Sequence, residues 1–508
     1  MAAMAAALLI AAGAASAAVT REAPIVDGYV VRISDQDGDL APADGVLPGE
    51  TIGIAVNATQ ETNWDPAITD SSGRVVAQLP IGKIERHKPA STEPWLEGSG
   101  YPVAFRWRVP ESLPSGLYFV DRRPELFFVV KAPPKAATPI VVLLPTNTLN
   151  AYTSTERRSL YKLPIQVTAV SFLRPQWPVP PESWRAFAQW VLEQHPFGST
   201  AVSYISDFDM EDEHVLDEAR ILIVLGHSEY WTRAARLTFD KFIGRGGSSI
   251  VAGGNVMWWQ TRYSPDHTIM YEYRALADKP PEEGGDPVKD PALKTKEWIN
   301  RALDYAIIPS IGGDYSHGGY GQLGRHDGQY RSRMTVIDSK SPLLAGLGLA
   351  DCDRIELPLT GEYDGAPISG LDGLGRPVAD FRAVGAYRYE LIAYEWNHHA
   401  TAYKLGTMEI MQRSKQSGLV LDMGARDCCI SSEFYADKEH GKLAVQQVLR
   451  NAVRLFLSHG DPFRGAARQV SYPLQTPWKS ELPAIPANAC APDPSTFATT
   501  LPGEQEPE

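Results

Sequence analysis

The sequence predicts an all-β domain followed by a doubly wound α/β domain, and two patterns support this order. Up to about residue 130, short apolar runs separated by turn residues follow one another, as in all-β proteins. From residue 136 onward, apolar strands alternate with amphipathic helical segments, which is typical of right-handed βαβ units around a parallel sheet. We therefore divide the chain into a leader, a β-sandwich, an α/β domain and a Pro-rich tail, at 1–19, 20–130, 136–460 and 461–508.

The composition of the 508 residues indicates a large globular protein. Its hydrophobic fraction of 44% is sufficient for at least one extensive core. The net charge of -13 is opposite in sign to the basic surfaces that bind nucleic acid, so we expect no nucleic-acid partner. The four cysteines include no CxxC pair, which argues against a zinc ribbon.

Residues 1–19 form an Ala-rich apolar leader that ends in Ala15-Ser16-Ala17, a pattern typical of a signal peptidase site. No Lys or Arg precedes the apolar run, so the basic start of a signal peptide is missing. Two interpretations stay open: a periplasmic or secreted protein with a signal peptide, or a cytoplasmic protein with an Ala-rich leader. No later apolar run is long enough to cross a bilayer, and we expect no membrane span in the mature chain.

Residues 20–130 are expected to form an immunoglobulin-like β-sandwich. The run 103–109 alternates apolar and polar residues, as a half-buried strand does. Residues 131–135 contain two adjacent prolines and are predicted to be an extended linker. The strand candidates of this domain are 25–31, 51–56, 103–109, 117–120 and 126–130.

The α/β domain is predicted from four apolar strands and the helical segments that separate and follow them. The first strand is a continuous apolar run, which indicates burial on both faces of a parallel sheet. The helical segments place apolar side chains at helical intervals. The strands are 140–144, 201–205, 219–225 and 249–252, and the helices are 183–194, 232–245 and 442–457.

Polar residues follow all four strands, at the ends where a parallel sheet places its binding site. Tyr152 comes shortly after the first strand, and Asp207 comes directly after the second. His227 and Glu229 follow the third strand and would share a face of an extended segment, while Asn255 follows the fourth. Taken singly, each also has a structural interpretation, such as a hydrogen-bonded His or an Asn in a turn.

A glycine-rich segment at 312–321 lacks the Lys and the helix of a phosphate-binding loop. We expect this segment to be a mobile loop on the surface. The alternative is that the loop covers the site.

Five sequence blocks occur in a fixed order: PTNT with a following AY, SFLRP, YISDFD, GHSEYW and GGN, which begin at Pro145, Ser171, Tyr204, Gly226 and Gly253. In this order they resemble the C-terminal domain of the N,N-dimethylformamidase large (β) subunit family, and GHSEYW is the most specific block. The resemblance covers about residues 138–458. It implies a domain similar to class I glutamine amidotransferases but without their nucleophilic cysteine, together with a small partner subunit.

The resemblance also implies a mononuclear iron held by two tyrosines and one glutamate. The positions that match these ligands are Tyr152, Tyr204 and Glu229. His227 and Asn255 would be polar groups beside the metal or the substrate. Glu362, in the sequence TGEYD, resembles a later acid of the family.

The chemistry of this ligand set is consistent with Fe(III). Two phenolates and a carboxylate are hard oxygen donors that carry three negative charges. A free phenol has a pKa of about 10, so metal binding and deprotonation would be coupled. Without a metal, Tyr152 and Tyr204 would be ordinary core tyrosines.

The expected function is iron-dependent hydrolysis of the C–N bond of a small amide. The enzyme would be a homo-oligomer or would have a small partner subunit. Formamidases of this type have a larger N-terminal region than this chain, so the substrate is left open. The alternative is a non-catalytic exported binding or adaptor protein that uses a degenerate amidotransferase-like domain.

Overall fold

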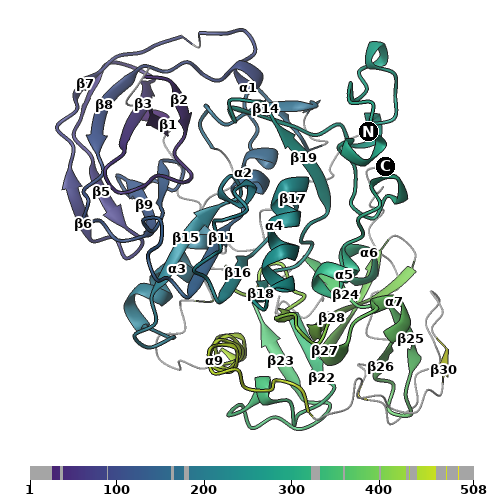
Figure 1. Ribbon diagram of the computed structural model, residues 1–508. Helices are drawn as coiled ribbons and strands as arrows, with labels where there is room; N and C mark the ends of the chain where they lie inside the picture. Colours follow the sequence, from purple (N-terminus) through teal and green to yellow (C-terminus); the bar gives the residue numbers. More distant parts are fainter. Residues whose placement is uncertain are drawn as a thin grey trace, which may run out of the picture.

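The structure is a computed structural model, and its elements are labelled in Figure 1. It describes residues 26–34, 38–88, 90–161, 165–176, 182–321, 332–358, 361–399, 402–430, 434, 443–464, 476–477 and 490. The expected leader at 1–19 and most of the expected tail at 461–508 lie outside these residues. More residues belong to strands than to helices.

Two antiparallel four-stranded sheets pack against each other in the N-terminal part of the chain. Apolar side chains of both sheets, such as Ile54, Val56, Val120 and Phe128, share one buried core. The first sheet has the order β2 (Leu40–Pro42), β1 (Val26–Ile33), β3 (Thr51–Ala58) and β8 (Val103–Arg108). The second has the order β10 (Phe127–Val130), β9 (Gly116–Val120), β5 (Ala67–Asp70) and β6 (Val75–Gln78).

The central sheet of the molecule begins with five parallel strands. In spatial order they are β15 (Val202–Ser206), β11 (Ile140–Leu144), β16 (Ile221–Leu225), β18 (Ser248–Ala252) and β29 (Leu419–Asp422). Their alternate side chains face two separate cores, because successive residues of a strand point to opposite faces. One core includes α3 (Glu182–Gln194) and α9 (Ala444–Leu457), and the other includes α4 (Arg233–Gly244).

The rest of this sheet is antiparallel, and the predicted doubly wound, amidotransferase-like α/β class is therefore wrong. Beyond β29 the order continues with β28 (Ala402–Gln412), β27 (Arg388–His399), β21 (Gly319–Tyr320) and β24 (Glu362–Gly365). β22 (Ser332–Val336) pairs with β27 and with β23 (Arg354–Leu357). The prediction failed because the strand–helix alternation ends after β18. The later chain pairs through long hairpin strands of 12 and 11 residues instead.

Smaller elements surround the central sheet. A mixed sheet has the order β14 (Ala169–Ser171), β20 (Ile269–Tyr271), β19 (Trp259–Tyr263) and β17 (Tyr230–Thr232). Short pairings join β4 (Thr62–Trp64) to β7 (Gly82–Ile84), β12 (Arg158–Ser159) to β13 (Ile165–Gln166), and β25 (Ile368–Leu371) to β26 (Pro377–Ala379) and β30 (Thr476–Pro477). The short helices are α1 (Pro94–Glu97), α2 (Thr146–Tyr152), α5 (Ile308–Ile311), α6 (Tyr315–Gly318) and α7 (Phe381–Val384). The 3-10 turns are η2 (Asp209–Glu211), η3 (Arg274–Leu276), η4 (Pro281–Glu283), η5 (Pro291–Leu293), η6 (Arg301–Leu303) and η7 (Pro342–Leu344).

The N-terminal sheets and the central sheet share apolar core across the linker at 131–135. Phe119 and Phe127 belong to the same buried cluster as Trp184 and Phe187 of α3. Polar contacts cross the same boundary, since the hydroxyl of Ser115 accepts a hydrogen bond from the backbone N–H of Tyr204 at 2.9 Å. The two parts therefore have an extensive apolar contact in addition to the covalent linker.

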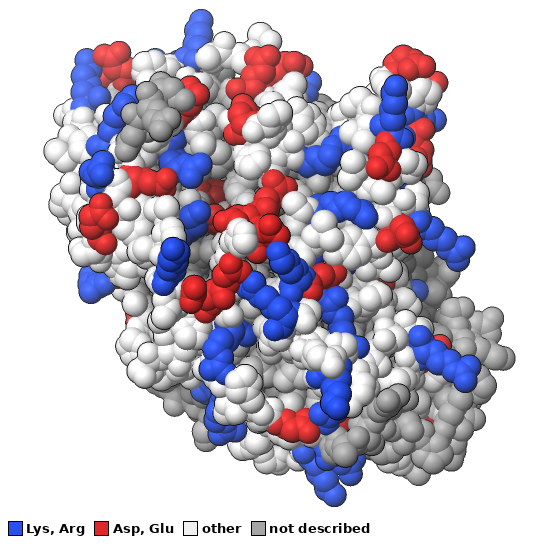
Figure 2. Space-filling view, viewed as in Figure 1, with Lys and Arg blue, Asp and Glu red and all other residues white. Residues whose placement is uncertain are grey.

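The surface shows mixed charge. Among the described residues on the face in Figure 2, Lys and Arg side chains are scattered between acidic ones and form no continuous basic area. Within the same described part of the chain, no helix has the length and apolarity needed to cross a bilayer.

The boundary between the two parts contains a carboxyl group that should make stability depend on pH. Burial and the neighbouring charge of Asp209 raise the pKa of Asp44 to about 7. The folded protein therefore binds this proton more tightly than the unfolded chain does, and the stability of the fold decreases as pH rises from about 4 to about 7. At pH 8, where the wild-type carboxyl group is charged and buried, we expect Asp44→Asn to raise the melting temperature by about a few degrees. Near pH 4, where the group is protonated, the same substitution should leave the melting temperature nearly unchanged.

Differential scanning calorimetry at both pH values measures this effect. Glu282→Gln, which changes an exposed carboxylate on η4, is the matched control and should alter neither melting temperature. An equal gain at both pH values would contradict the assignment to Asp44.

Candidate active site

Side chains from five separate segments meet beyond the carboxyl ends of the parallel strands. Tyr152 ends α2, while His227 and Glu229 lie in the turn between β16 and β17. Asn255 lies in the turn after β18, and Glu362 begins β24 of the antiparallel part. A fifth segment, after β29, contributes Arg426.

Glu229 has the largest number of described polar contacts in this cluster. Its Oε2 accepts a hydrogen bond of 2.8 Å from the hydroxyl of Tyr152 and lies 3.3 Å from Nε2 of His227. Its Oε1 accepts a hydrogen bond from the indole of Trp259 at 3.1 Å and lies 3.4 Å from Nδ2 of Asn255. The backbone N–H of Glu229 donates to Thr148 Oγ1, which fixes the carboxylate to the start of α2.

Glu362 approaches the same imidazole from the opposite part of the sheet. Its Oε2 lies 3.4 Å from Nε2 of His227 and 3.5 Å from Nδ2 of Asn255. The guanidinium of Arg426 donates a hydrogen bond of 3.2 Å to this oxygen, while its Nε donates to Asp427. His227 is therefore placed between two carboxylates, one from its own turn and one from β24.

The charges of this cluster shift the titration of its members. Burial alone would lower the pKa of His227, but the carboxylates of Glu362 and Glu229 outweigh it and raise that pKa above its ordinary value. Burial alone would raise the pKa of Glu229, but the charge and hydrogen bond of His227, with Arg274 and Tyr152, lower it. Burial and the charge of Glu229 raise the pKa of the Tyr152 phenol well above its ordinary value. The site thus favours an imidazolium and a carboxylate in contact.

The turns that carry these groups contact one another through backbone. A Cβ atom on Gly253 would lie 2.0 Å from the carbonyl oxygen of Gly226, which directly precedes His227. A Cβ atom on Gly254 would lie 2.7 Å from the amide nitrogen of Arg426. Asn255 itself has a φ of 51°, in the left-handed region that Asn tolerates better than most residues. The GGN block is therefore required by packing at this junction.

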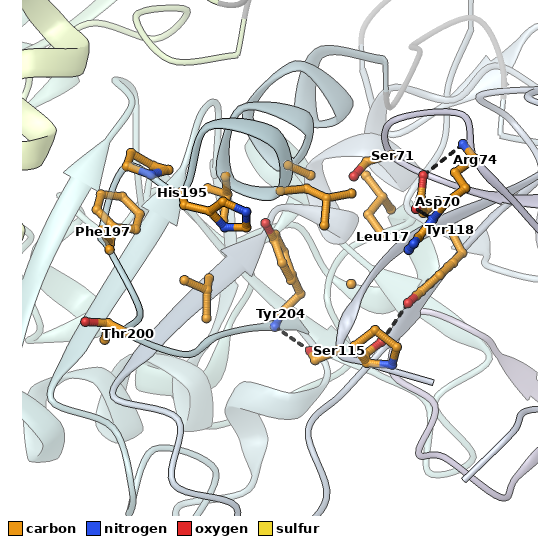
Figure 3. Close-up of a pocket in the computed structure, with 18 residues that line it drawn as sticks. Asp70, Ser71, Arg74, Ser115, Leu117, Tyr118, His195, Phe197, Thr200 and Tyr204 are labelled. Atoms are coloured by element: carbon orange, nitrogen blue, oxygen red, sulfur yellow. Dashed lines mark hydrogen bonds and ion pairs between the residues drawn. The ribbon is translucent and has the colours of Figure 1, made fainter. Parts of the chain in front are cut away.

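Tyr204, the second expected metal ligand, lies elsewhere. It sits in the middle of β15 in register with Val142, and its side chain joins the core under α3. It lines a cavity of about 230 Å³ between the N-terminal sheets and α3, where Figure 3 shows it between Ser115 and His195. The structure thus does not bring Tyr204 to Glu229, because its position on the strand directs the side chain to a face of the sheet rather than to its end.

A different tyrosine lies beside Tyr152. The ring centroids of Tyr152 and Tyr161 are 4.9 Å apart. Burial, followed by the charges of Glu362 and Glu229, raises the pKa of Tyr161, so its phenol lies within the field of both carboxylates. Sequence reasoning missed Tyr161 because it follows the short strand β12, which the sequence did not predict, and lies outside the five sequence blocks.

Two further residues of the site were also missed. Trp259 lies beyond the GGN block, and its indole N–H donates to Glu229. Arg274 lies in the 3-10 turn η3, with its guanidinium 4.4 Å from the centroid of the Trp259 ring and bonded to the hydroxyl of Tyr230. No sequence motif marks Trp259 or Arg274 as a site residue, because each reaches the site through tertiary contacts alone.

The glycine-rich segment at 312–321 is not the mobile surface loop that the sequence predicted. It forms α6 and β21 and packs on β24, where a Cβ atom on Gly318 would lie 2.1 Å from the carbonyl oxygen of Tyr363. Tyr315 of this segment is 7% exposed and has its pKa raised by burial and then by Glu362. Its glycines are therefore explained by close backbone packing beside the site.

A family described as "N,N-dimethylformamidase beta subunit-like, C-terminal" matches residues 60–427, more than half of the chain. This range contains every residue of the cluster described above. The chain belongs to the N,N-dimethylformamidase β subunit-like family. The match begins within the N-terminal sheets. It therefore starts well before residue 138, the beginning of the range that the sequence blocks indicated.

Other comparisons add little to the family assignment. No curated protein matches the chain. Matching solved structures include a ThuA-like protein from Bacteroides uniformis, at 11% identity and a TM-score of 0.29, covering 65% of this chain and 96% of that one. The N-terminal domain of mmIFT52 matches at 12% identity and a TM-score of 0.26, covering 53% of this chain and 90% of that one. At these TM-scores neither likeness bears on the fold of this family member.

Within the described residues, no group of three or more His, Cys, Asp or Glu side chains is arranged to hold a metal ion. The hydroxyl of Tyr152 contacts Glu229, and the ring of Tyr161 lies beside that of Tyr152.

The close contact of Gly253 with Gly226 predicts a sharp effect on stability. Gly253→Ala places a Cβ atom against backbone that cannot rotate away, so we expect a loss of about 1–3 kcal/mol or more in the free energy of unfolding. Urea denaturation followed by tryptophan fluorescence measures this loss. Gly244→Ala is the control, because a Cβ atom at this last position of α4 meets nothing within 4 Å. Equal stability of the two variants would disprove the packing argument.

Proposed function

We propose that this protein is an iron(III)-dependent hydrolase that cleaves the C–N bond of a small amide. The observation that carries the proposal is the meeting of Tyr152, His227, Glu229, Asn255 and Glu362 in one buried site. The name of the family supports amide hydrolysis as the class of reaction. The precise amide is left to experiment.

The donor set beside Glu229 fits iron(III). Phenol and carboxylate oxygens are hard ligands, and two tyrosines with one glutamate would supply three negative charges. We assign the ligands to Tyr152, Tyr161 and Glu229, with Tyr161 in place of Tyr204. Support comes from the 4.9 Å between the two phenol rings and from the effect of Glu229 on the pKa of both tyrosines.

When bound, iron(III) would supply Lewis acidity toward an amide carbonyl. The residues around it would move protons. His227 has a raised pKa, so its imidazolium can donate a proton from Nε2 to the departing amine. Glu362, 3.4 Å from that nitrogen and bonded to Arg426, can accept a proton from water.

Asn255 is suited to orient the substrate. Its side chain is 3% exposed, and no described protein group pairs with its Oδ1. A buried amide oxygen without a partner carries a desolvation cost that a substrate N–H or a water molecule would remove. The side chains of His227 and Arg426, each 16% exposed, are more accessible than those of Glu229 and Glu362, at 6% and 8%, so we place the substrate entrance beside them.

Two parts of the proposal concern location and assembly. We infer export from the leader at 1–19, as a periplasmic or secreted protein. We also propose association with a small partner subunit or with further copies of the chain, in agreement with the family description as β subunit-like.

Substitution of the tyrosines tests the metal site. We expect Tyr152→Phe and Tyr161→Phe each to lose stoichiometric iron and the tyrosinate-to-iron absorption band, because each removes one anionic ligand but keeps the ring. Tyr204→Phe is the matched control and should keep both. Metal analysis by mass spectrometry and visible absorbance give the measurement.

A colourless parent protein without iron, after expression with iron present, would contradict the metal assignment. In that case the non-catalytic exported binding or adaptor protein becomes the better explanation. Loss of iron in Tyr204→Phe but not in Tyr161→Phe would restore the ligand set expected from the sequence.

Substitution of Glu362 tests the proton transfer separately. We expect Glu362→Gln to retain iron and to lower kcat for amide hydrolysis by on the order of a hundredfold or more, since the amide cannot accept a proton from water. Glu390→Gln is the control, because this buried glutamate on β27 contacts Arg464 rather than the site. Unchanged turnover in Glu362→Gln would remove Glu362 from the mechanism.

A further inference from the structure

We infer that Asp364 is a positioning residue that holds Asn255 in its substrate-facing conformation by accepting the backbone N–H of Val256. This inference rests on the proposed function for its kinetic consequence. The contact itself does not depend on that function. Asp364 lies two residues after Glu362 on β24, and neither the composition nor the family description assigns it a role.

β24 connects the two acids to the Asn255 turn. Residues two apart on a strand point to the same face, so Glu362 and Asp364 both face the ends of the parallel strands. The Oδ2 of Asp364 accepts a hydrogen bond of 3.2 Å from the N–H of Val256. The backbone N–H of Asp364 donates to the carbonyl oxygen of Gly424 at 3.1 Å, which fixes the strand to the segment that carries Arg426.

The turn at Asn255 needs such an external contact. Asn255 and Met257 have φ angles of 51° and 59°, so two non-glycine residues in three occupy the left-handed region. Such a conformation is strained for a residue other than glycine and persists only where the surroundings hold it. The N–H of Met257 donates to the carbonyl oxygen of Ser228 at 2.8 Å. Asp364 accepts the N–H of Val256, which lies between Asn255 and Met257.

The surroundings of Asp364 indicate that it works as a neutral hydrogen-bond acceptor. Asp364, Glu409 and Asp422 are each 0% exposed, and Asp314 also faces Asp364. Burial, followed by the charge of Asp422, raises the pKa of Asp364 well above its ordinary value. A protonated carboxyl group still accepts a hydrogen bond through its carbonyl oxygen, and an asparagine amide has the same shape and the same acceptor.

This argument predicts that an amide can replace the acid. We expect Asp364→Asn to keep kcat/KM for hydrolysis of N,N-dimethylformamide, or of the small amide that the parent turns over, close to the parent value. Asp364→Ala should lower it by on the order of tenfold to a hundredfold with iron content unchanged, because Asn255 is no longer aligned. The double variant Asn255→Ala/Asp364→Ala should be no slower than Asn255→Ala, since both changes remove the same interaction with the substrate.

Hydrogen–deuterium exchange measures the contact without any substrate. The peptide that spans 251–258 should exchange faster in Asp364→Ala and at the parent rate in Asp364→Asn. Glu409→Gln is the matched control: it changes a neighbouring buried acid for which no contact with the turn is described, and should affect neither this peptide nor kcat/KM. If Asp364→Ala does not fold, Asp364→Val, which fills the space with apolar atoms, takes its place.

The possible results separate the two claims. Parent-like exchange in Asp364→Ala, Asp364→Asn as impaired as Asp364→Ala, or additive losses in the double variant would each overturn the positioning role. Faster exchange in Asp364→Ala in a protein that hydrolyses no amide would instead refute the proposed function and leave the contact established.

Discussion

The burial of the Glu229 carboxylate is the constraint on which the site depends. A charge taken out of water is tolerated only where paired charges and hydrogen bonds replace the lost hydration. Glu229 is 5% exposed, and Tyr152, His227, Asn255 and Trp259 supply these contacts from α2, from the turn before β17 and from the segment after β18. The turns that carry them must therefore approach closely, which explains the backbone contact between Gly226 and Gly253.

The mixed sheet makes this convergence possible. Its parallel half directs the turns after β16 and β18 to one edge, as a parallel sheet does. Its antiparallel half returns β24 to the same edge, so that Glu362 faces His227 from the opposite side. A sheet of parallel strands alone would supply the first carboxylate but would lack this second one.

β24 also carries two buried acids, Glu362 and Asp364, whose surroundings favour different charge states. At Glu362 the strand faces His227 and Arg426, which balance a carboxylate. Two residues later, burial and the charge of Asp422 raise the pKa of Asp364, which favours the neutral acid. The same short strand thus supports a charged site at Glu362 and an uncharged acceptor for the Asn255 turn at Asp364.

The sequence by itself determined the local features: the apolar parallel strands, the polar residues that follow them, the family, and the grouping of Tyr152, His227, Glu229 and Asn255 beyond the strand ends. The strands and the grouping follow from periodicity and from the common direction of parallel strands, which act over short distances along the chain. The family is indicated by the order of the five sequence blocks that begin at Pro145. Only the tertiary structure decided the antiparallel half of the sheet, the place of Tyr204 under α3, and the arrival of Tyr161, Trp259 and Arg426 at the site. Pairing between distant strands and the direction of a single side chain depend on packing across the whole molecule, and no local pattern records them.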